Sequence, residues 1–162
     1  MPIVTCDISD AYPGDVAVCE VQFRHFGQRR AFAGACETLR VRDHNLVRET
    51  VALPGEGRIL VVDGGGSLAA GLMGDQLAEL ARANGWQGAV IFGAIRDSAV
   101  IDGMQFGVKA LGTTARRSPV EHGGERSVPV SFGGVIFRPG DWVYADADAV
   151  IVSVRPLLEL LE

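Results

Sequence analysis

Two apolar runs in the middle of the chain predict neighbouring buried strands. Residues 59–62 form a short run of branched apolar side chains that stops at Asp63, which three glycines follow, and residues 89–95 are again continuously apolar. Uninterrupted apolar runs are typical of strands that are covered on both faces of a parallel sheet. The chain between the two runs is long enough for a crossover helix, which parallel strands require.

The segment between these runs has the pattern of that helix. Residues 76–83 contain good helix formers, and Asn84-Gly85 provides a stop signal. The apolar stripe at positions i, i+3 and i+4 consists of Leu77, Leu80 and Ala81. We therefore expect a crossover helix that begins near Gly74-Asp75 and joins the two strands.

Charged residues follow the second strand directly, at the edge of the sheet where ligands bind. Arg96 and Asp97 come immediately after residues 89–95, and open α/β sheets bind ligands at the carboxyl ends of their strands. The helix start at Gly74-Asp75 should face the same edge. Its unpaired N–H groups and the positive end of the helix dipole favour a carboxylate or phosphate. The alternative is structural: Asp75 is only the N-cap and the glycines only turn the chain.

The rest of the chain predicts further short elements around this unit. Thr5 is a candidate cap for the first helix, and residues 112–125 are expected to be a polar surface loop. The expected helices are 5–12, 46–52 and 98–102, and the expected strands are 16–23, 35–42, 106–111, 128–132, 135–137, 142–145 and 149–152.

A basic segment with Arg24, Arg29 and Arg30 is interpreted as a solvated loop, with an anion or subunit contact as the alternative. The apolar tail 157–161 should pack on its own domain or on another subunit. The prediction is an α/β fold with a β-rich C-terminal part.

Composition limits the classes of protein that fit. The 162 residues are 48% hydrophobic, which suits one domain over residues 1–162. A net charge of -5 without a basic stripe argues against direct nucleic-acid binding. Three cysteines without a CxxC pair suggest neither a disulfide framework nor a zinc site. With no apolar run of membrane-spanning length and no signal-like start, we expect a soluble, cytoplasmic protein that does not bind membranes.

The pair Arg96-Asp97 suggests chemistry on an acid substrate. Arg96 has the planar fork that grips carboxylate or carbonyl oxygens. Asp97 could hold Mg2+, which takes only one or two protein carboxylates and keeps several waters. The alternative for both residues is a salt bridge or a loop cap.

Other chemistries fit less well. The glycine run 64–66 contains neither a dinucleotide fingerprint nor a P-loop. Lys109 is the only lysine and falls in an expected strand, which weakens Schiff-base catalysis. The three histidines His25, His44 and His122 have no zinc-binding or triad spacing and are expected at the surface. A metal–carboxylate site with an arginine remains, and it suits the stabilisation of an enolate.

Several stretches resemble the RraA family, which includes regulators of ribonuclease activity and 4-hydroxy-4-methyl-2-oxoglutarate aldolases. They are VVDGGGSLAAGLMGDQLAELARANGW, GAIRD, FGVKALG, VSFGGVIFRPGDWVYADADAVIVS and, near the start, FRHFGQRRAFAG. The family signature, an aspartate, twenty intervening residues and an Arg-Asp pair, is matched by Asp75, Arg96 and Asp97.

The resemblance implies a swivelling β/β/α-type domain and a ring-shaped homotrimer with sites between subunits. It also implies roles for particular residues. The helix start, Gly74, Asp75, Gln76 and Leu77, would bind the substrate carboxylate, Arg96 would contact the substrate oxygens, and Asp97 would anchor a divalent metal, Mg2+ or Mn2+. Arg96 and Asp97 would be the catalytic pair.

The implied activity is metal-dependent aldol cleavage of a small 2-oxo dicarboxylic acid, with oxaloacetate decarboxylation through the same pyruvate enolate. Aldolases of the family often carry an acidic residue three positions after the Arg-Asp aspartate, whereas this chain has Val100 there and Asp102 as the first carboxylate. Asp102 is therefore a candidate substitute base. The resemblance also leaves a second function open, a non-catalytic regulator that binds and inhibits an RNase E type ribonuclease through its acidic outer surface.

Overall fold

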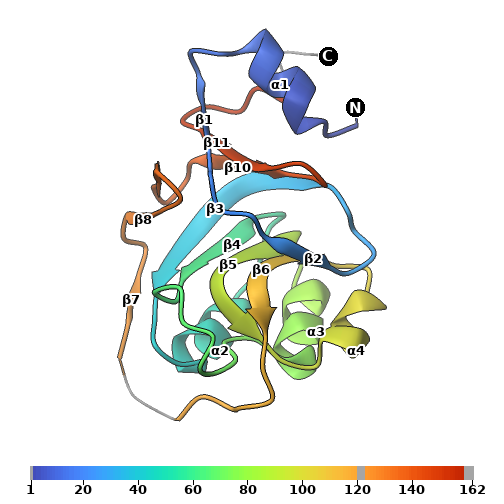
Figure 1. Cartoon of the computed structure of the whole chain (residues 1–162), viewed down its shortest axis with the longest axis vertical. Helices are drawn as coiled ribbons and strands as arrows, with labels where there is room; N and C mark the ends of the chain where they lie inside the picture. Colours follow the sequence, from blue (N-terminus) through green and yellow to red (C-terminus); the bar gives the residue numbers. More distant parts are fainter. Residues whose placement is uncertain (1, 120–122, 159–162) are drawn as a thin grey trace.

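A nine-stranded sheet with four parallel strands at its centre organises the fold (Figure 1). The structure, a computed structural model, describes residues 2–119 and 123–158. The strand order is β1-β11-β10-β3-β4-β5-β6-β2, with β7 paired to β3. The four central strands β3, β4, β5 and β6 run parallel, and their neighbours pair with them antiparallel.

Fifteen elements make up the described part of the chain. The helices are α1 (Thr5–Ala11), α2 (Asn45–Val51), α3 (Asp75–Ala83) and α4 (Ser98–Asp102). The strands are β1 (Val16–Val18), β2 (Arg24–Phe26), β3 (Phe32–Arg40), β4 (Ile59–Asp63), β5 (Gly88–Ile95), β6 (Gly107–Thr113), β7 (Glu125–Arg126), β8 (Val130–Phe132), β9 (Val135–Phe137), β10 (Trp142–Ala145) and β11 (Val150–Ser153).

The predicted strand–helix–strand unit is present as β4, α3 and β5, and the two strands pair in parallel. Strand β4 is apolar throughout because it separates two cores. Ile59 and Val61 belong to the core on one face of the sheet, and Leu60 and Val62 belong to the core on the other. Successive side chains of a strand point to opposite faces, so a strand covered on both sides needs an apolar residue at every position.

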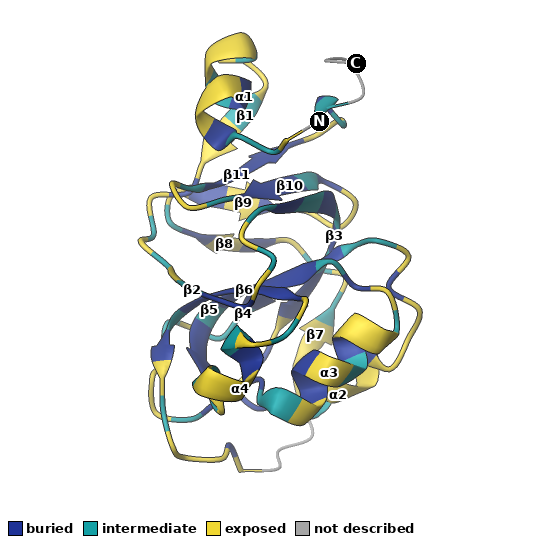
Figure 2. Ribbon diagram, turned by 90° about the vertical axis from the view of Figure 1, so that its right-hand side faces the viewer, coloured by how far each residue is buried: buried dark blue, intermediate teal, exposed yellow. Residues whose placement is uncertain are grey.

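The layers follow from these two cores (Figures 1 and 2). Helices α2, α3 and α4 cover one face of the parallel strands and contribute Val47, Leu77 and Ile101 to the shared core. The hairpin β8–β9 supplies Phe132 and Phe137 to the core on the other face. Helix α1 packs separately, against β10 and β11 at the antiparallel end. The helices thus leave the carboxyl ends of the parallel strands open on one side, where α3 begins.

The expected strand at 16–23 is present only over residues 16–18. Residues 16–18 form β1 at one edge of the sheet, whereas residues 24–26 form β2 at the opposite edge. The chain between them crosses the sheet and is held by backbone hydrogen bonds such as Cys19 N–H to Val150 O at 2.9 Å. The expected strand at 35–42 also begins earlier, because β3 starts at Phe32 within the segment interpreted as a basic loop.

The basic segment contributes structural contacts. Arg29 donates to the backbone and side-chain oxygens of Gln87 at 2.8 and 2.9 Å. Arg24 lies over the ring of Phe26, with 5.1 Å between its guanidinium carbon and the ring centre. These contacts tie the segment to its own chain, so these two arginines are not simply solvated.

Both ends of the described chain pack on the antiparallel part of the sheet. Val4, not Thr5, is the N-cap of α1, so the expected cap is wrong. Thr5 instead donates from its N–H and hydroxyl groups to the carboxylate of Asp146, at 2.7 and 2.8 Å. At the other end, Leu157 packs on its own domain, where it is fully buried, and its N–H donates to the hydroxyl of Tyr144 at 2.8 Å. Residues 159–161 of the expected tail lie outside the described residues.

Within the described residues, none of the helices has the length and apolar character needed to cross a membrane. The prediction of a single domain over residues 1–162 stays a prediction. It is supported by the sheet, which takes strands from both halves of the chain.

Candidate active site

The predicted site residues lie around one pocket. It has a volume of about 260 Å3 and opens at the carboxyl end of β5, beside the first turn of α3. All six predicted residues line it: Gly74, Asp75, Gln76, Leu77, Arg96 and Asp97. The fold therefore brings the helix start and the Arg-Asp pair together, as the parallel arrangement of β4 and β5 requires.

Asp97 is held toward α3 by an unusual backbone conformation. Its φ of 55° is left-handed, which costs free energy for any residue with a side chain and persists only where the surroundings impose it. Although Asp97 precedes α4, its side chain does not cap that helix. Instead, its Oδ2 accepts a hydrogen bond from the N–H of Asp75 at 3.2 Å. The Asp97 carboxylate thus lies at the positive end of the α3 dipole.

Gly74 makes this approach possible. A Cβ on Gly74 would lie 2.8 Å from Oδ2 of Asp97, closer than a carbon tolerates. Gly74 is also the N-cap of α3, so the alternative that Asp75 is the cap is wrong. Asp75 lies in the first turn, where its Oδ1 accepts from the N–H of Gln76 at 2.9 Å. Two N–H groups at the helix start therefore already bind carboxylates of the chain itself.

Arg96 is positioned by its backbone and leaves its guanidinium free. Its N–H donates to the carbonyl of Met73 at 2.9 Å, and its side chain passes over Gly71, where a Cβ would come within 2.3 Å of Cγ. The Arg96 guanidinium makes no ion pair or hydrogen bond to any other described residue. Arg96 is therefore not part of a salt bridge within the described residues. Asp97 does act in part as a cap, because its carboxylate accepts an N–H group at the start of α3.

Three further pocket residues with ionisable side chains were not identified from the sequence. They are His44, Arg48 and Arg117, which come from the end of the β3–α2 loop, from α2 and from the loop after β6. His44 was expected at the surface, and that expectation is wrong because only 6% of it is exposed. A usable signal did exist: parallel strands end at the same edge, so the loops after β3 and β6 reach the edge where Arg96 lies.

His44 is a neutral imidazole with one unsatisfied nitrogen. Its Nδ1 pairs with Oγ of Ser118, which also accepts the N–H of His44 at 3.1 Å. Its Nε2 is buried and has no hydrogen-bond partner among the residues that the structure describes. Burial lowers the pKa of His44, and the positive charges of Arg48 and Arg117 lower it further. The uncharged ring therefore adds no positive charge to the pocket.

The carboxylates of this pocket fit Mg2+ better than zinc. Asp97 and Asp75 both line the pocket, and a divalent magnesium ion takes one or two protein carboxylates with water in its other positions. Among the residues that the structure describes, no three His, Cys, Asp or Glu side chains come together as a metal-binding group. A zinc site, which needs three or four protein ligands, is not formed by them.

Asp102, the candidate substitute base, does not line the pocket. Its Oδ1 accepts from the N–H of Gly27 at 3.0 Å, and its carbonyl accepts from the side chain of Gln28 at 2.8 Å. These contacts attach the loop after β2 to α4. Val100, at the position where family aldolases often carry an acid, is 54% exposed. The groups that line the pocket and can accept a proton are Asp75, Asp97 and neutral His44.

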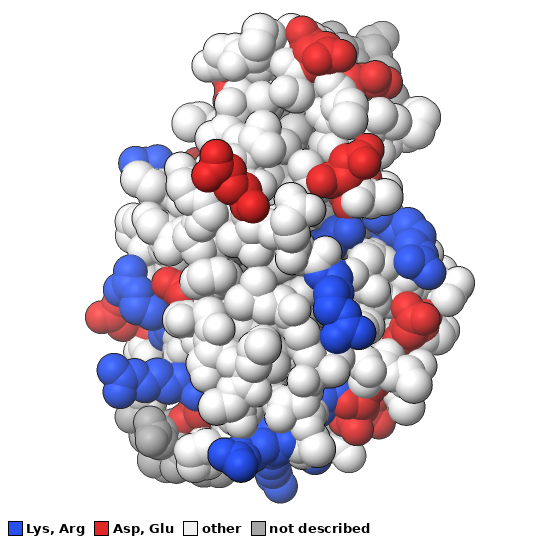
Figure 3. Space-filling model, viewed as in Figure 1, with Lys and Arg blue, Asp and Glu red and all other residues white. Residues whose placement is uncertain are grey.

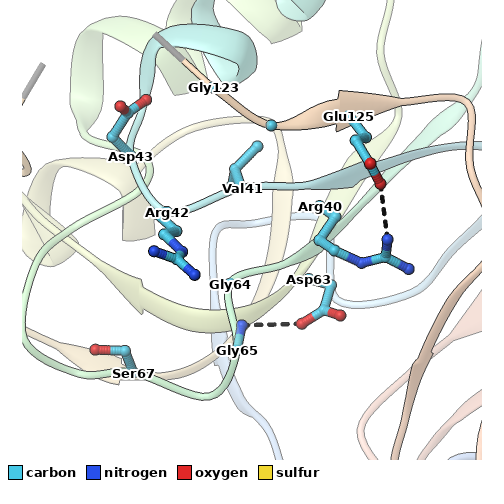
Figure 4. Close-up of a pocket in the computed structure, with 11 residues that line it drawn as sticks. Arg40, Val41, Arg42, Asp43, Asp63, Gly64, Gly65, Ser67, Gly123 and Glu125 are labelled. Carbon is cyan, nitrogen blue, oxygen red and sulfur yellow. Dashed lines mark hydrogen bonds and ion pairs between the residues drawn. The ribbon is translucent and has the colours of Figure 1, made fainter. Parts of the chain in front are cut away.

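A second, larger cavity lies along the same edge of the sheet, at the ends of β3 and β4 (Figure 4). It measures about 820 Å3 and shares no lining residue with the smaller pocket. Two of its charged groups pair with each other, and a third accepts a backbone hydrogen bond. Arg40 pairs with Glu125 at 2.7 Å, and Asp63 accepts the N–H of Gly65 at 2.9 Å. The glycine run after β4 therefore borders this cavity and not the pocket of Arg96.

Comparison with known proteins identifies the family. Residues 5–152 match the RraA-like family model described as Aldolase/RraA, so the chain belongs to that family. A protein of Ectopseudomonas mendocina named "Putative 4-hydroxy-4-methyl-2-oxoglutarate aldolase" is 48% identical over 158 residues, covering 97% of this chain and 98% of the relative. A Hahella chejuensis protein of the same name is 47% identical over 158 residues, covering 97% of this chain and 96% of the relative.

Solved structures share the fold across nearly the whole chain. The RNA-processing inhibitor RraA from Thermus thermophilis matches with a TM-score of 0.92 and 39% identity, covering 96% of this chain and 95% of that one. A Geobacillus kaustophilus structure described as an S-adenosylmethionine:2-dimethylmenaquinone methyltransferase matches with a TM-score of 0.95 and 43% identity, covering 97% of this chain and 98% of that one. The predicted mixed α/β fold with a β-rich C-terminal part is thus confirmed.

Proposed function

We propose that this protein is a metal-dependent carbon–carbon lyase that cleaves 4-hydroxy-4-methyl-2-oxoglutarate into two molecules of pyruvate and also decarboxylates oxaloacetate. One observation carries the proposal: the free guanidinium of Arg96, the carboxylate of Asp97 and the start of α3 line a single pocket of about 260 Å3. That volume suits a small organic acid. Relatives with 47–48% identity that are named as such aldolases support the same reading.

The chemistry follows from the charges of these side chains. Arg96 can donate two parallel hydrogen bonds to the 2-oxo acid group, which orients the substrate. A base of the pocket takes the proton of the 4-hydroxyl group as its oxygen becomes a carbonyl and the carbon–carbon bond breaks. The electron pair of that bond passes to the 2-oxo oxygen, the guanidinium stabilises the negative charge of the enolate, and a proton added to the enolate carbon gives the second pyruvate. Asp97, with Asp75 nearby, would hold Mg2+ or Mn2+, and the bound ion would supply Lewis-acid polarisation of the carbonyl group. Oxaloacetate loses carbon dioxide through the same enolate, so one site serves both reactions.

The test is coupled detection of pyruvate from oxaloacetate and from 4-hydroxy-4-methyl-2-oxoglutarate. Wild type and Asp97→Ala are assayed side by side, with Mg2+ and with a chelator, and the metal-only rate is subtracted. We expect pyruvate release by the wild type with Mg2+ and none above background with chelator or with Asp97→Ala. An unchanged rate in Asp97→Ala would show that the site is assigned to the wrong residue.

The methyltransferase description of the Geobacillus kaustophilus structure does not suit this pocket. S-adenosylmethionine carries an adenosine group and is much larger than the small organic acids that suit a pocket of about 260 Å3. Titration with S-adenosylmethionine is therefore expected to give no binding.

We further propose that the protein assembles as the homotrimer expected from the family resemblance, with small 2-oxo dicarboxylic acids bound between subunits. Light scattering that gives the mass of a monomer under the assay conditions would contradict this arrangement. Sedimentation at several protein concentrations would then show whether assembly depends on concentration.

A second candidate function is regulation of a ribonuclease, supported by the similarity to the RNA-processing inhibitor RraA. One face of the molecule shows acidic and no basic side chains at its upper end, over α1 (Figure 3). An acidic surface suits attraction to a basic segment of a partner protein. A pull-down with an RNase E type enzyme should then weaken with salt and be unaffected by Asp97→Ala. Absence of binding at low salt would remove this candidate.

A further inference from the structure

Three arginines from different parts of the chain line the small pocket. Arg48 lies on α2, Arg96 follows β5, and Arg117 lies in the loop after β6. Within the described residues, none of the three guanidinium groups makes an ion pair or a hydrogen bond. Five of the eleven arginines outside the pocket are paired with carboxylates: Arg40, Arg58, Arg82, Arg126 and Arg155. The pocket thus concentrates uncompensated positive charge, which an anionic ligand would neutralise.

The buried ring of His44 shows that these charges converge. After burial, the charges of Arg48 and Arg117 are the largest causes that lower its pKa, and Arg96 contributes a smaller effect in the same direction. Asp43 acts in the opposite direction. All three guanidinium groups are therefore close enough to act on one imidazole, although Arg48 and Arg117 themselves are exposed.

Hydrogen bonds fix the loop that carries Arg117. Ser118 is buried, and its Oγ binds both the N–H and the Nδ1 of His44. On the other side of Arg117, the carbonyl of Arg116 accepts the N–H of Gly71 at 2.9 Å. The loop is thus attached on both sides of Arg117, which holds this arginine beside the pocket.

The start of α3 leaves limited capacity for a second carboxylate. The N–H groups of Asp75 and Gln76 already bind the carboxylates of Asp97 and Asp75. A ligand that carries two carboxylates therefore needs further donors, and the free guanidinium groups that line the pocket supply them. Arginine is suited to this task because its planar fork matches a carboxylate.

We propose that Arg48 and Arg117 form a carboxylate-binding subsite that makes the pocket select 2-oxo acids with a second carboxylate over 2-oxo monocarboxylic acids. This inference rests on the proposed lyase function and adds its source of specificity. Arg96 binds the 2-oxo acid end of the ligand, and the pair at the mouth binds the distal carboxylate. The contact between His44 and Ser118 is a positioning element for Arg117.

The test compares binding of two acids that share the 2-oxo acid end. Pyruvate carries one carboxylate, and 2-oxoglutarate carries a second one but has no 4-hydroxyl group, so aldol cleavage cannot consume it. Each acid is titrated calorimetrically into the full chain in the presence of Mg2+. We expect 2-oxoglutarate to bind about tenfold more tightly than pyruvate, a difference typical of one charge-assisted contact.

Variants then separate the subsite from the overall charge. Arg48→Gln and Arg117→Gln should each weaken 2-oxoglutarate binding about fivefold to thirtyfold and leave pyruvate binding within about twofold. Arg116→Gln is the matched control. It removes the same charge from the same loop, but Arg116 lines a different cavity. Ser118→Ala should weaken 2-oxoglutarate binding selectively, and Ser118→Thr, which keeps the hydroxyl, should restore it.

The outcomes distinguish this inference from the proposed function. If the wild type releases pyruvate from oxaloacetate but binds the two acids equally, or if Arg116→Gln has the same effect as Arg117→Gln, the subsite is refuted and the lyase assignment stands. If the wild type neither binds pyruvate nor releases it from either substrate, the lyase assignment itself fails.

Discussion

The N–H of Asp75 donates a hydrogen bond to Oδ2 of Asp97 at 3.2 Å, across 22 positions of sequence. This contact joins the start of α3 to the end of β5. It requires the left-handed backbone of Asp97 and the absence of a side chain at Gly74. The acid proposed to hold the metal is therefore kept in place by the start of α3, which lines the same pocket.

Two variants of Asp97 should separate its charge from its structural role. Asn tolerates the left-handed conformation and can still accept the N–H of Asp75, whereas Ala can do neither well. We expect both variants to lose pyruvate release, by roughly a hundredfold or more, but only Asp97→Ala to lose stability, by about 1 kcal/mol. Thermal unfolding and the pyruvate assay measure the two effects. Activity retained in Asp97→Asn would show that the negative charge is not needed.

Gly71→Ala should displace Arg96. The new Cβ would lie 2.3 Å from Cγ and 2.8 Å from Cδ of Arg96, so the arginine must leave its present rotamer. We expect pyruvate release to fall about tenfold or more, because a small misplacement of an orienting group is costly. Gly14→Ala is the control, since no atom lies within 4 Å of the added Cβ.

A double-mutant cycle checks the cause of this effect. If the clash with Arg96 is responsible, Gly71→Ala should destabilise an Arg96→Ala background less than it destabilises the wild type, by about 1 kcal/mol or more. Equal destabilisation in both backgrounds, measured by denaturant unfolding, would mean that Arg96 is not the group displaced.

Asp146 should make the attachment of the N-terminal helix depend on pH. Burial alone would raise the pKa of Asp146, but hydrogen bonds from Thr5 and from the backbone of Asp148 and Ala149 lower it below its usual value. Because the folded pKa is lowered, the stabilisation is present above the unfolded value of about 3.9 and is lost as pH falls through the folded value.

The measurement is the free energy of unfolding of wild type and Asp146→Asn as a function of pH. We expect the wild type to be more stable near neutral pH and the difference to shrink below about pH 4. Asp10→Asn, on the exposed side of α1, removes an equal charge as the control. A difference that does not change with pH would contradict the role given to the ionised carboxylate.

The cysteines should differ in reactivity. Cys36 is buried, and burial raises its pKa to about 12, while burial also raises the pKa of Cys19. Cys6 is exposed, although its hydrogen bond to Asp148 raises its pKa as well. Since the thiolate is the reactive form, we expect a thiol reagent to modify Cys6 alone in the native protein and all three cysteines after denaturation. Fast modification of a second thiol in the native protein would indicate local opening near Cys19 or Cys36.

Several parts of the fold were predictable because their signals are local. Continuous apolar runs identify β4 and β5, and the glycine before Asp75 marks the start of α3. The expected strand 16–23 extended β1 into the segment that crosses the sheet, because an extended crossing segment has the same composition as a strand, and β2 was not predicted. Strands β1 and β2 lie at opposite edges of the sheet, and the local pattern does not encode which strand each one pairs with.

The amino-acid sequence by itself determined that Arg96 and Asp97 leave a buried strand beside the start of α3, since connection rules place consecutive parallel strands and their helix together. The tertiary structure alone decided that His44, Arg48 and Arg117 join them. Their segments are brought together by the order of β3, β4, β5 and β6 in the sheet. That order depends on the packing of two cores at once, so residues more than 70 positions apart, such as His44 and Ser118, meet only in the folded chain.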